Sequence, residues 1–124
     1  MSHLVAAVAA ISLVSTPLLQ AGSQSFWDSR GAYGGSVYQE YWVTTTAATT
    51  FDMDVSASGY NSSASGTVYT QGGGTVGFCY AYSNPNVMHD DYIGTNKPAG
   101  TYRVVHQGGV YGSGYANWTS HVTW

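Results

Sequence analysis

The side chains best suited to chemistry gather in one stretch, residues 77–94, which reads GFCYAYSNPNVMHDDYIG. It holds Cys79, the only cysteine of the chain, together with His89, Asp90 and Asp91. A thiolate nucleophile needs a nearby base and an orienting acid, and this stretch supplies all three residue types. No catalytic signature surrounds the cysteine, however, so we do not expect a nucleophilic enzyme.

The cysteine lies in TVGFCYAYS (75–83), where alternation of period two predicts a strand. The residues that share one face of this strand are Val76, Phe78, Tyr80 and Tyr82. We expect these aromatic residues to face the core, which leaves Cys79 half-buried on the opposite side. Because an odd cysteine in an exported chain can pair with another molecule, an intermolecular disulfide through Cys79 is the alternative.

Residues 84–91, NPNVMHDD, are predicted to form a polar loop. Calcium takes six to eight oxygen ligands, and Asp90 and Asp91 with nearby Asn side chains could supply several of them. The hypothesis is a calcium-type site at Asp90 and Asp91. The alternative is a solvated loop in which Asn and Asp form turns. No other cofactor is expected.

Two further pairs of polar residues have side chains of the types used in catalysis or metal binding. Asp52 and Asp54 share a strand face roughly 7 Å apart, within the range of about 6.5–9.5 Å for an inverting glycosidase. Such sites occupy clefts of larger folds, so outward, solvated aspartates are expected instead. His106 and His121 are predicted on strand faces that do not converge, which argues against a shared metal.

Aromatic residues are the strongest functional signal in the composition. The chain has four Trp and eleven Tyr, more than a core of this size needs. Exposed rings can stack on sugar rings or make protein contacts, although Tyr can also simply fill strand positions. The rings predicted to form a ligand-binding platform are Trp27, Tyr33, Tyr38, Trp42, Tyr111 and Tyr115.

The elements that would position these side chains are all β. From Ser25 onward, period-two alternation is separated by turns rich in Gly, Asn and Ser. Strands are expected within 37–58 and at 66–71, 75–83, 101–107 and 115–124, with loops at 59–66, 84–91 and 108–114. Short strands at this spacing, without an amphipathic helix, predict an all-β domain over residues 24–124, a small antiparallel β-sandwich of the jelly-roll kind.

Residues 98–106, PAGTYRVVH, resemble the PAGTY turn and strand of secreted bacterial β-sandwich modules of the pre-peptidase C-terminal type. In those modules the turn leads into a late strand, and a further strand ends the domain. The resemblance covers nine residues and implies a non-catalytic accessory β-sandwich. It identifies no binding residue.

Charge is scarce, at 7% Asp, Glu, Lys and Arg against roughly 25% in a typical soluble domain. The basic residues are Arg30, Lys97 and Arg103, too few for a phosphate-binding stripe, so no nucleic-acid partner is expected. A surface this neutral repels its own copies weakly, which favours self-association. Such a surface suits a secreted or cell-surface protein.

Residues 1–23 contain the only long uncharged apolar run, and Ala21-Gly22-Ser23 fits a small-x-small cleavage pattern. A secretory signal peptide is predicted, although its first residues lack Lys and Arg. The alternative is a retained apolar segment that meets a membrane through residues 4–21. Asn61 and Asn117 begin N-glycosylation sequons, whose use depends on the source.

Together these patterns predict an exported, non-catalytic β-sandwich that binds or self-assembles at the cell surface or in the extracellular matrix. A filament or adhesion subunit and a carbohydrate-binding accessory module both fit, with copies of itself or a glycan or cell-wall surface as partner. The alternative is a secreted, bacteriocin-like toxin that acts on a target cell envelope.

Overall fold

The computed structural model describes residues 23–31 by their backbone and residues 35–84 and 86–124 in full. It contains β1 (Ser23–Gly31), β2 (Gly35–Thr45), β3 (Thr49–Ser58), β4 (Ser62–Thr70), β5 (Thr75–Ser83), β6 (Met88–Lys97), β7 (Gly100–Val110) and β8 (Tyr115–Thr123). Within the described ranges, no helix is long and apolar enough to span a bilayer. The predicted leader lies outside the described residues except for Ser23, where β1 begins.

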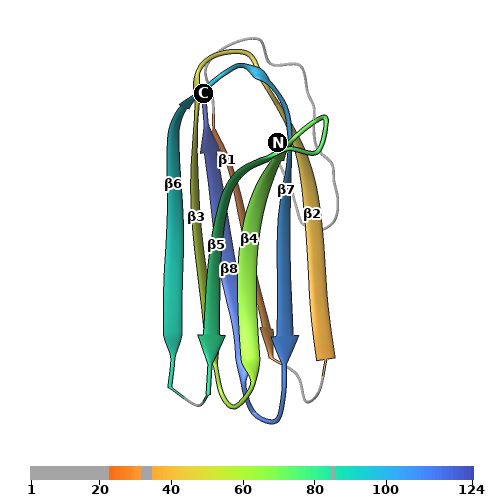
Figure 1. The fold of residues 1–124 in the computed structure, drawn as a ribbon, viewed down its shortest axis with the longest axis vertical. Helices are drawn as coiled ribbons and strands as arrows, with labels where there is room; N and C mark the ends of the chain where they lie inside the picture. The colour runs from red at the N-terminus through yellow and green to blue at the C-terminus, as the bar shows by residue number, and fades with distance from the viewer. Residues whose placement is uncertain (1–22, 32–34, 85) are drawn as a thin grey trace.

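The strands form two four-stranded antiparallel sheets that pack face to face (Figure 1). Sheet A has the order β1-β8-β3-β6, and sheet B has the order β2-β7-β4-β5. Among the eight described strands, β4 and β5 are the only consecutive pair that lies in one sheet, and every other consecutive pair is divided between the two sheets. This is the strand order of a jelly roll, and it confirms the predicted fold class.

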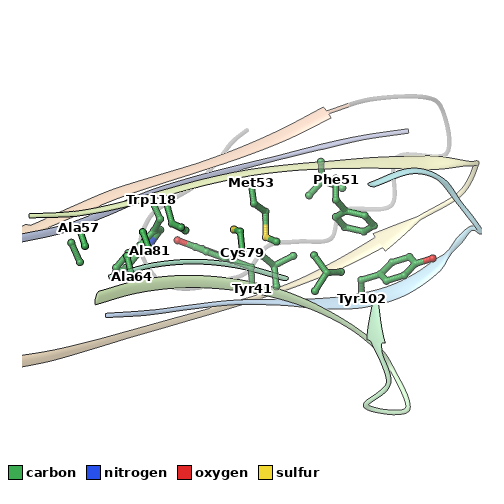
Figure 2. Close-up of a cluster of buried hydrophobic side chains, with 14 of the residues drawn as sticks. Tyr41, Phe51, Met53, Ala57, Ala64, Cys79, Ala81, Tyr102 and Trp118 are labelled. Atoms are coloured by element: carbon green, nitrogen blue, oxygen red, sulfur yellow. The ribbon is translucent and has the colours of Figure 1, made fainter. Parts of the chain in front are cut away.

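The core lies between the sheets and follows strict alternation on β3 and β8. On β3, Phe51, Met53 and Val55 point inward, as their spacing predicts, and each is at most 1% exposed. Each fully buried apolar side chain of this size stabilises the fold by roughly 1.5–3 kcal/mol. Figure 2 shows Phe51 and Tyr102 at one end of the core, and Trp118 together with several alanines at the other. The gap between the sheets is therefore filled by different residue sizes along its length.

The predicted orientation of β5 is wrong. Phe78, Tyr80 and Tyr82 are 55%, 48% and 44% exposed, whereas Cys79 and Ala81 are buried. The reason is that large side chains already fill the space that β5 faces, since Met53 and His106 lie against Gly66, the cross-strand partner of Cys79. Bulky rings on this side would overpack the core, so the strand turns its small residues inward.

The predicted loop at residues 84–91 is also partly wrong, because β6 already begins at Met88. β6 pairs with β3 and places Asp91 directly opposite Asp54. Similarly, β4 begins at Ser62, so the predicted loop over 59–66 is reduced to a tight turn. Some polar residues in these stretches, such as Ser63 and Asp91, occupy outward-facing strand positions, which propensity alone identifies poorly.

Side chains from β6 bridge the two sheets along the side where β5 and β6 run as neighbouring edge strands. The Tyr80 backbone N–H donates to Asp90 Oδ2 at 2.9 Å. The Tyr92 hydroxyl donates to the Val76 carbonyl at 3.3 Å, and its ring occupies space that a Cβ on Gly77 would enter, at 2.0 Å from the ring. An edge strand exposes unpaired backbone groups, and these bridges cover part of that edge.

A histidine in the core joins the sheets through polar contacts. His106 on β7 is fully buried; its Nδ1 lies 3.3 Å from the Ser65 carbonyl, and its Nε2 contacts the Ser120 hydroxyl of β8. Because a carbonyl only accepts, the fitting tautomer carries its proton on Nδ1. The ring stacks on Trp118 with centroids 5.5 Å apart. Burial lowers the pKa of His106 to about 4, so the ring is neutral.

Candidate functional site

The two outer faces of the sandwich differ in chemistry. The outer face of sheet A carries polar and ionisable residues, with Asp52, Asp54, Asp91, His89 and His121 among them. The outer face of sheet B carries rings from three strands. We call these residues the aromatic face; they are Tyr38, Trp42, Tyr69, Phe78, Tyr80 and Tyr82. Solvent-exposed rings on one face of a rigid sheet form a candidate contact surface.

The β2 part of the aromatic face is organised around Glu40. Tyr38, Glu40 and Trp42 occupy alternate positions, so they share one side of the strand. The Tyr38 hydroxyl donates to Glu40 Oε1 at 2.7 Å, and Trp42 Nε1 donates to Oε2 at 3.0 Å. The rings remain 55% and 49% exposed. Both are therefore held at their polar tips while much of their surface stays open.

Arg103 on β7 completes this arrangement beside Trp42, its cross-strand partner. Its Nη1 lies 3.3 Å from Glu40 Oε1, and its guanidinium lies 4.5 Å from the ring centroid of Tyr69. The Tyr38 hydrogen bond is the largest cause that lowers the pKa of Glu40, and the Arg103 contact adds to it. The carboxylate is consequently ionised and shared among three donors.

The β5 part of the aromatic face lies at the other side of sheet B. Phe78 and Tyr80 stack with their ring centroids 6.3 Å apart and an angle of 10° between planes. The Tyr82 hydroxyl donates to Asn61 Oδ1 at 2.8 Å. Sequence reasoning assigned these rings to the core because it could not fix which side of β5 faces inward. The small size of the intervening Cys79 and Ala81 was the signal that could have corrected it.

The strip between these ring groups is lined by smaller side chains of β7 and β4. Cross-strand pairing places Gln107 beside Tyr38 and Ser65, and Val105 beside Glu40 and Thr67. Val105 points outward but is only 4% exposed, because its neighbours cover it. The face thus combines rings with amide and hydroxyl groups that can form hydrogen bonds.

The six predicted platform residues do not gather in one place. Tyr38 and Trp42 lie on the aromatic face, whereas Tyr111 and Tyr115 flank the β7–β8 turn and are 55% and 45% exposed. Tyr33 and the side chain of Trp27 lie outside the described residues. Of the described members, Tyr38 and Trp42 lie on the aromatic face, and the role of the platform in ligand binding stays a prediction.

Asp90 and Asp91 are not arranged to chelate one cation together. As neighbours in a strand they point to opposite faces, and Asp90 accepts the hydrogen bond from Tyr80 described above. Asp54 lies near His89, with Oδ1 and Nε2 3.4 Å apart. Among the described residues there is no group of three or more His, Cys, Asp or Glu side chains that could hold a metal.

Cys79 is buried and reduced, with 1% of its surface exposed. Burial, and next the nearby Asp90 charge, raise the pKa of its thiol to about 12. A thiol in this state is neither a good nucleophile nor accessible to a second chain, which contradicts the expected half-buried position and opposes an intermolecular disulfide. The contact between Ser120 and His106 is equally enclosed, so it serves the core and offers no nucleophile to a substrate.

No family model matches the chain, and no curated protein matches it. The resemblance of residues 98–106 to an accessory module therefore stays a prediction, although its turn and strand are present in β7.

Solved structures with a similar fold come from phage, virus and bacterium. The enzymatically active domain of bacteriophage CBA120 tailspike protein 4 aligns with a TM-score of 0.47 at 9% identity, covering 84% of this chain and 18% of that one. The VP2 subviral particle of infectious bursal disease virus gives 0.45 at 12%, covering 94% and 37%. PliG, a periplasmic inhibitor of g-type lysozyme from Aeromonas hydrophila, gives 0.43 at 18%, covering 88% and 91%. The chain thus spans well under half of the phage and virus proteins, and at these identities the likeness concerns the fold alone.

Proposed function

We propose that this protein is a non-catalytic binding module that engages a carbohydrate chain through the aromatic face of sheet B. The observation that carries the proposal is the exposure of five large rings, between 44% and 55%, on one side of one sheet: Tyr38, Trp42, Phe78, Tyr80 and Tyr82. Leaving such rings in water is unfavourable, and stacking on the apolar face of a sugar would remove this cost.

The backbone beneath the rings supports this function. The rings project from strands held in antiparallel ladders, with one register shift at Val68 and Tyr69, so little ordering is needed on binding. Gln107 and Ser65 lie between the ring groups and can exchange hydrogen bonds with hydroxyl groups. Scarce charge and the predicted leader favour an exported setting at the cell surface or in the matrix.

Replacement of Trp42 tests the proposal. Trp42→Ala should weaken retardation by a bound polysaccharide in affinity gel electrophoresis by about tenfold or more, as expected for an aromatic anchor. Hydroxyethyl cellulose, xyloglucan and galactomannan serve as the polysaccharides. Tyr115→Ala is the control, because Tyr115 is 45% exposed at the start of β8, on the outer face of sheet A.

Equal losses in the two variants, or no retardation of the unmodified protein by any polysaccharide, neutral or anionic, would contradict the proposal. Self-association is the second candidate, because the same exposed rings could be covered by another copy of a weakly charged chain. Sedimentation velocity separates the two. A dimer that Trp42→Ala dissociates, without any polysaccharide binding, would favour self-assembly.

A further inference from the structure

We infer that the ligand is a neutral glycan, and that Glu40 is a positioning residue that holds the rings of the aromatic face instead of meeting the ligand as a free charge. This inference rests on the proposed function and names the ligand class for the same face. It follows from how the charges on sheet B are paired.

The Glu40 carboxylate has its two oxygens engaged by its own neighbours. Oε1 accepts from the Tyr38 hydroxyl at 2.7 Å and lies 3.3 Å from Arg103 Nη1, and Oε2 accepts from Trp42 Nε1 at 3.0 Å. These donors come from both directions along β2 and from the adjacent strand. A carboxylate already accepting from three donors gains little by contacting ligand hydroxyl groups.

Arg103 is similarly engaged. One nitrogen of its guanidinium faces Glu40, and its plane lies over Tyr69, 4.5 Å from the ring centroid. A guanidinium held by a carboxylate and an aromatic ring has less attraction left for a ligand anion. The side chain is 30% exposed, so the pair sits at the surface but its charges cancel locally.

No other Asp, Glu, Lys or Arg lies on the outer face of sheet B within the described residues. The face therefore has no net charge. By contrast, three aspartates lie on the outer face of sheet A, and the chain carries a formal net charge of −3. An anionic polysaccharide would find no unpaired cation at the rings and would be repelled at longer range. A neutral, hydroxyl-rich polysaccharide needs no unpaired cation at the rings and is not repelled by the negative charge of the protein.

The hydrogen bonds to Glu40 also explain how the rings are presented. They hold Tyr38 and Trp42 by the polar tip and leave about half of each side chain exposed. A ring fixed before binding loses less conformational freedom when a sugar stacks on it. Glu40 thus acts through the rings. Its replacement should change both the affinity for neutral polysaccharides and the preference for neutral over anionic ones.

The test compares full-length protein with Glu40→Gln and with the double variant Glu40→Gln/Arg103→Gln. Hydroxyethyl cellulose, xyloglucan and galactomannan are the neutral probes, and polygalacturonate and alginate are the anionic ones, all in affinity gels at low ionic strength. Unmodified protein should bind a neutral probe and no anionic one. Glu40→Gln should weaken neutral binding by about 2- to 10-fold, as rings that are no longer fixed must be ordered on binding.

The result that distinguishes a positioning role of Glu40 is a gain of binding to the anionic probes. Glu40→Gln frees the charge of Arg103, so this variant should bind the anionic probes, and salt at about 0.5 M should abolish that binding. The double variant should lose it again while resembling Glu40→Gln on neutral probes. Thermal melts of each variant check folding. If Glu40→Gln fails to fold, Arg103→Gln alone should keep neutral binding within about threefold, because Glu40 still holds both rings.

The outcomes separate the two claims. Unmodified protein that binds anionic probes at least as well as neutral ones would overturn the ligand class and leave carbohydrate binding standing. Neutral binding that Glu40→Gln leaves unchanged, with no gain for anions, would overturn the positioning role. Absence of binding to all five probes would overturn the proposed function itself.

Discussion

His106 places an ionisable ring inside the core, which ties stability to pH. Its pKa falls from an ordinary value of 6.5 to about 4 because burial penalises the charged form. Between these two values the unfolded chain binds a proton that the folded chain does not. Folding stability is therefore unaffected by this group above about pH 6.5, and decreases as the pH falls toward 4, by at most about 1.4 kcal/mol per pH unit.

We expect the free energy of unfolding to fall by up to about 3 kcal/mol between pH 6.5 and 4 because of His106. His106→Gln should be less stable at pH 7, since it disturbs the contacts with Ser120 and Trp118, but its stability should depend less on pH across this window. Urea denaturation at several pH values measures the difference. His121→Gln, at an exposed position, is the control and should keep the original slope. Identical slopes for His106→Gln and the unmodified protein would refute this account.

At the level of the strand, alternation predicts that an element exists but does not always predict which side faces inward. On β3 the sequence predicts clearly which side faces inward, because apolar residues alternate with Asp and Ser. On β5 both sides carry apolar side chains, so ring size suggested burial of Phe78 and Tyr80. Side chains such as Met53 of β3 and His106 of β7 already fill the space that β5 faces, so only small residues of β5 fit there.

Replacement of Asp90 tests whether the bridge between β6 and β5 stabilises the fold and protects this edge from association. Asp90→Ala removes the acceptor of the Tyr80 N–H and should lower the free energy of unfolding by about 1 kcal/mol. The uncovered edge should also associate more readily at high concentration, because inward-pointing charges protect edge strands. Chemical denaturation and sedimentation velocity measure these two effects.

Asp91→Ala is the matched control, since it lies one residue away on the opposite side of the same strand. Asp91 faces Asp54 across the ladder, so its removal should be neutral or slightly stabilising by relief of like-charge repulsion. If both substitutions destabilise the protein equally, the effect belongs to β6 in general and the bridge has no separate role.

At the scale of the whole molecule, sequence patterns predicted the fold class, while the aromatic face depended on strand order. Its residues come from chain positions as distant as Tyr38, Tyr69 and Tyr82, and they meet because sheet B has the order β2-β7-β4-β5. Arg103 meets Glu40 for the same reason. Alternation within one strand contains no information about which strands lie beside it. The contacts of Glu40 with Tyr38 and Trp42 could therefore be predicted from the sequence, whereas its contact with Arg103 of β7 could not.

Cys79 reports on the integrity of the whole sandwich, because it lies between the sheets in the space that β5 closes. The thiol is 1% exposed and its pKa is raised to about 12, so both access and thiolate formation oppose reaction at pH 8. We expect a colorimetric disulfide reagent to label native protein far more slowly than protein unfolded in urea. Labelling should then follow the opening of the sandwich, and its rate should rise in parallel with destabilisation by His106→Gln.

Oxidation provides the opposing test of the same arrangement. With the thiol enclosed, native protein treated with a mild oxidant should remain a monomer on non-reducing gels, whereas unfolded protein should form disulfide dimers. Rapid labelling at pH 8, or dimers formed under native conditions, would mean that β5 separates from the core without unfolding of the rest. In that case Cys79 could link two chains, and the β5 rings would belong to a mobile edge instead of a preformed binding face.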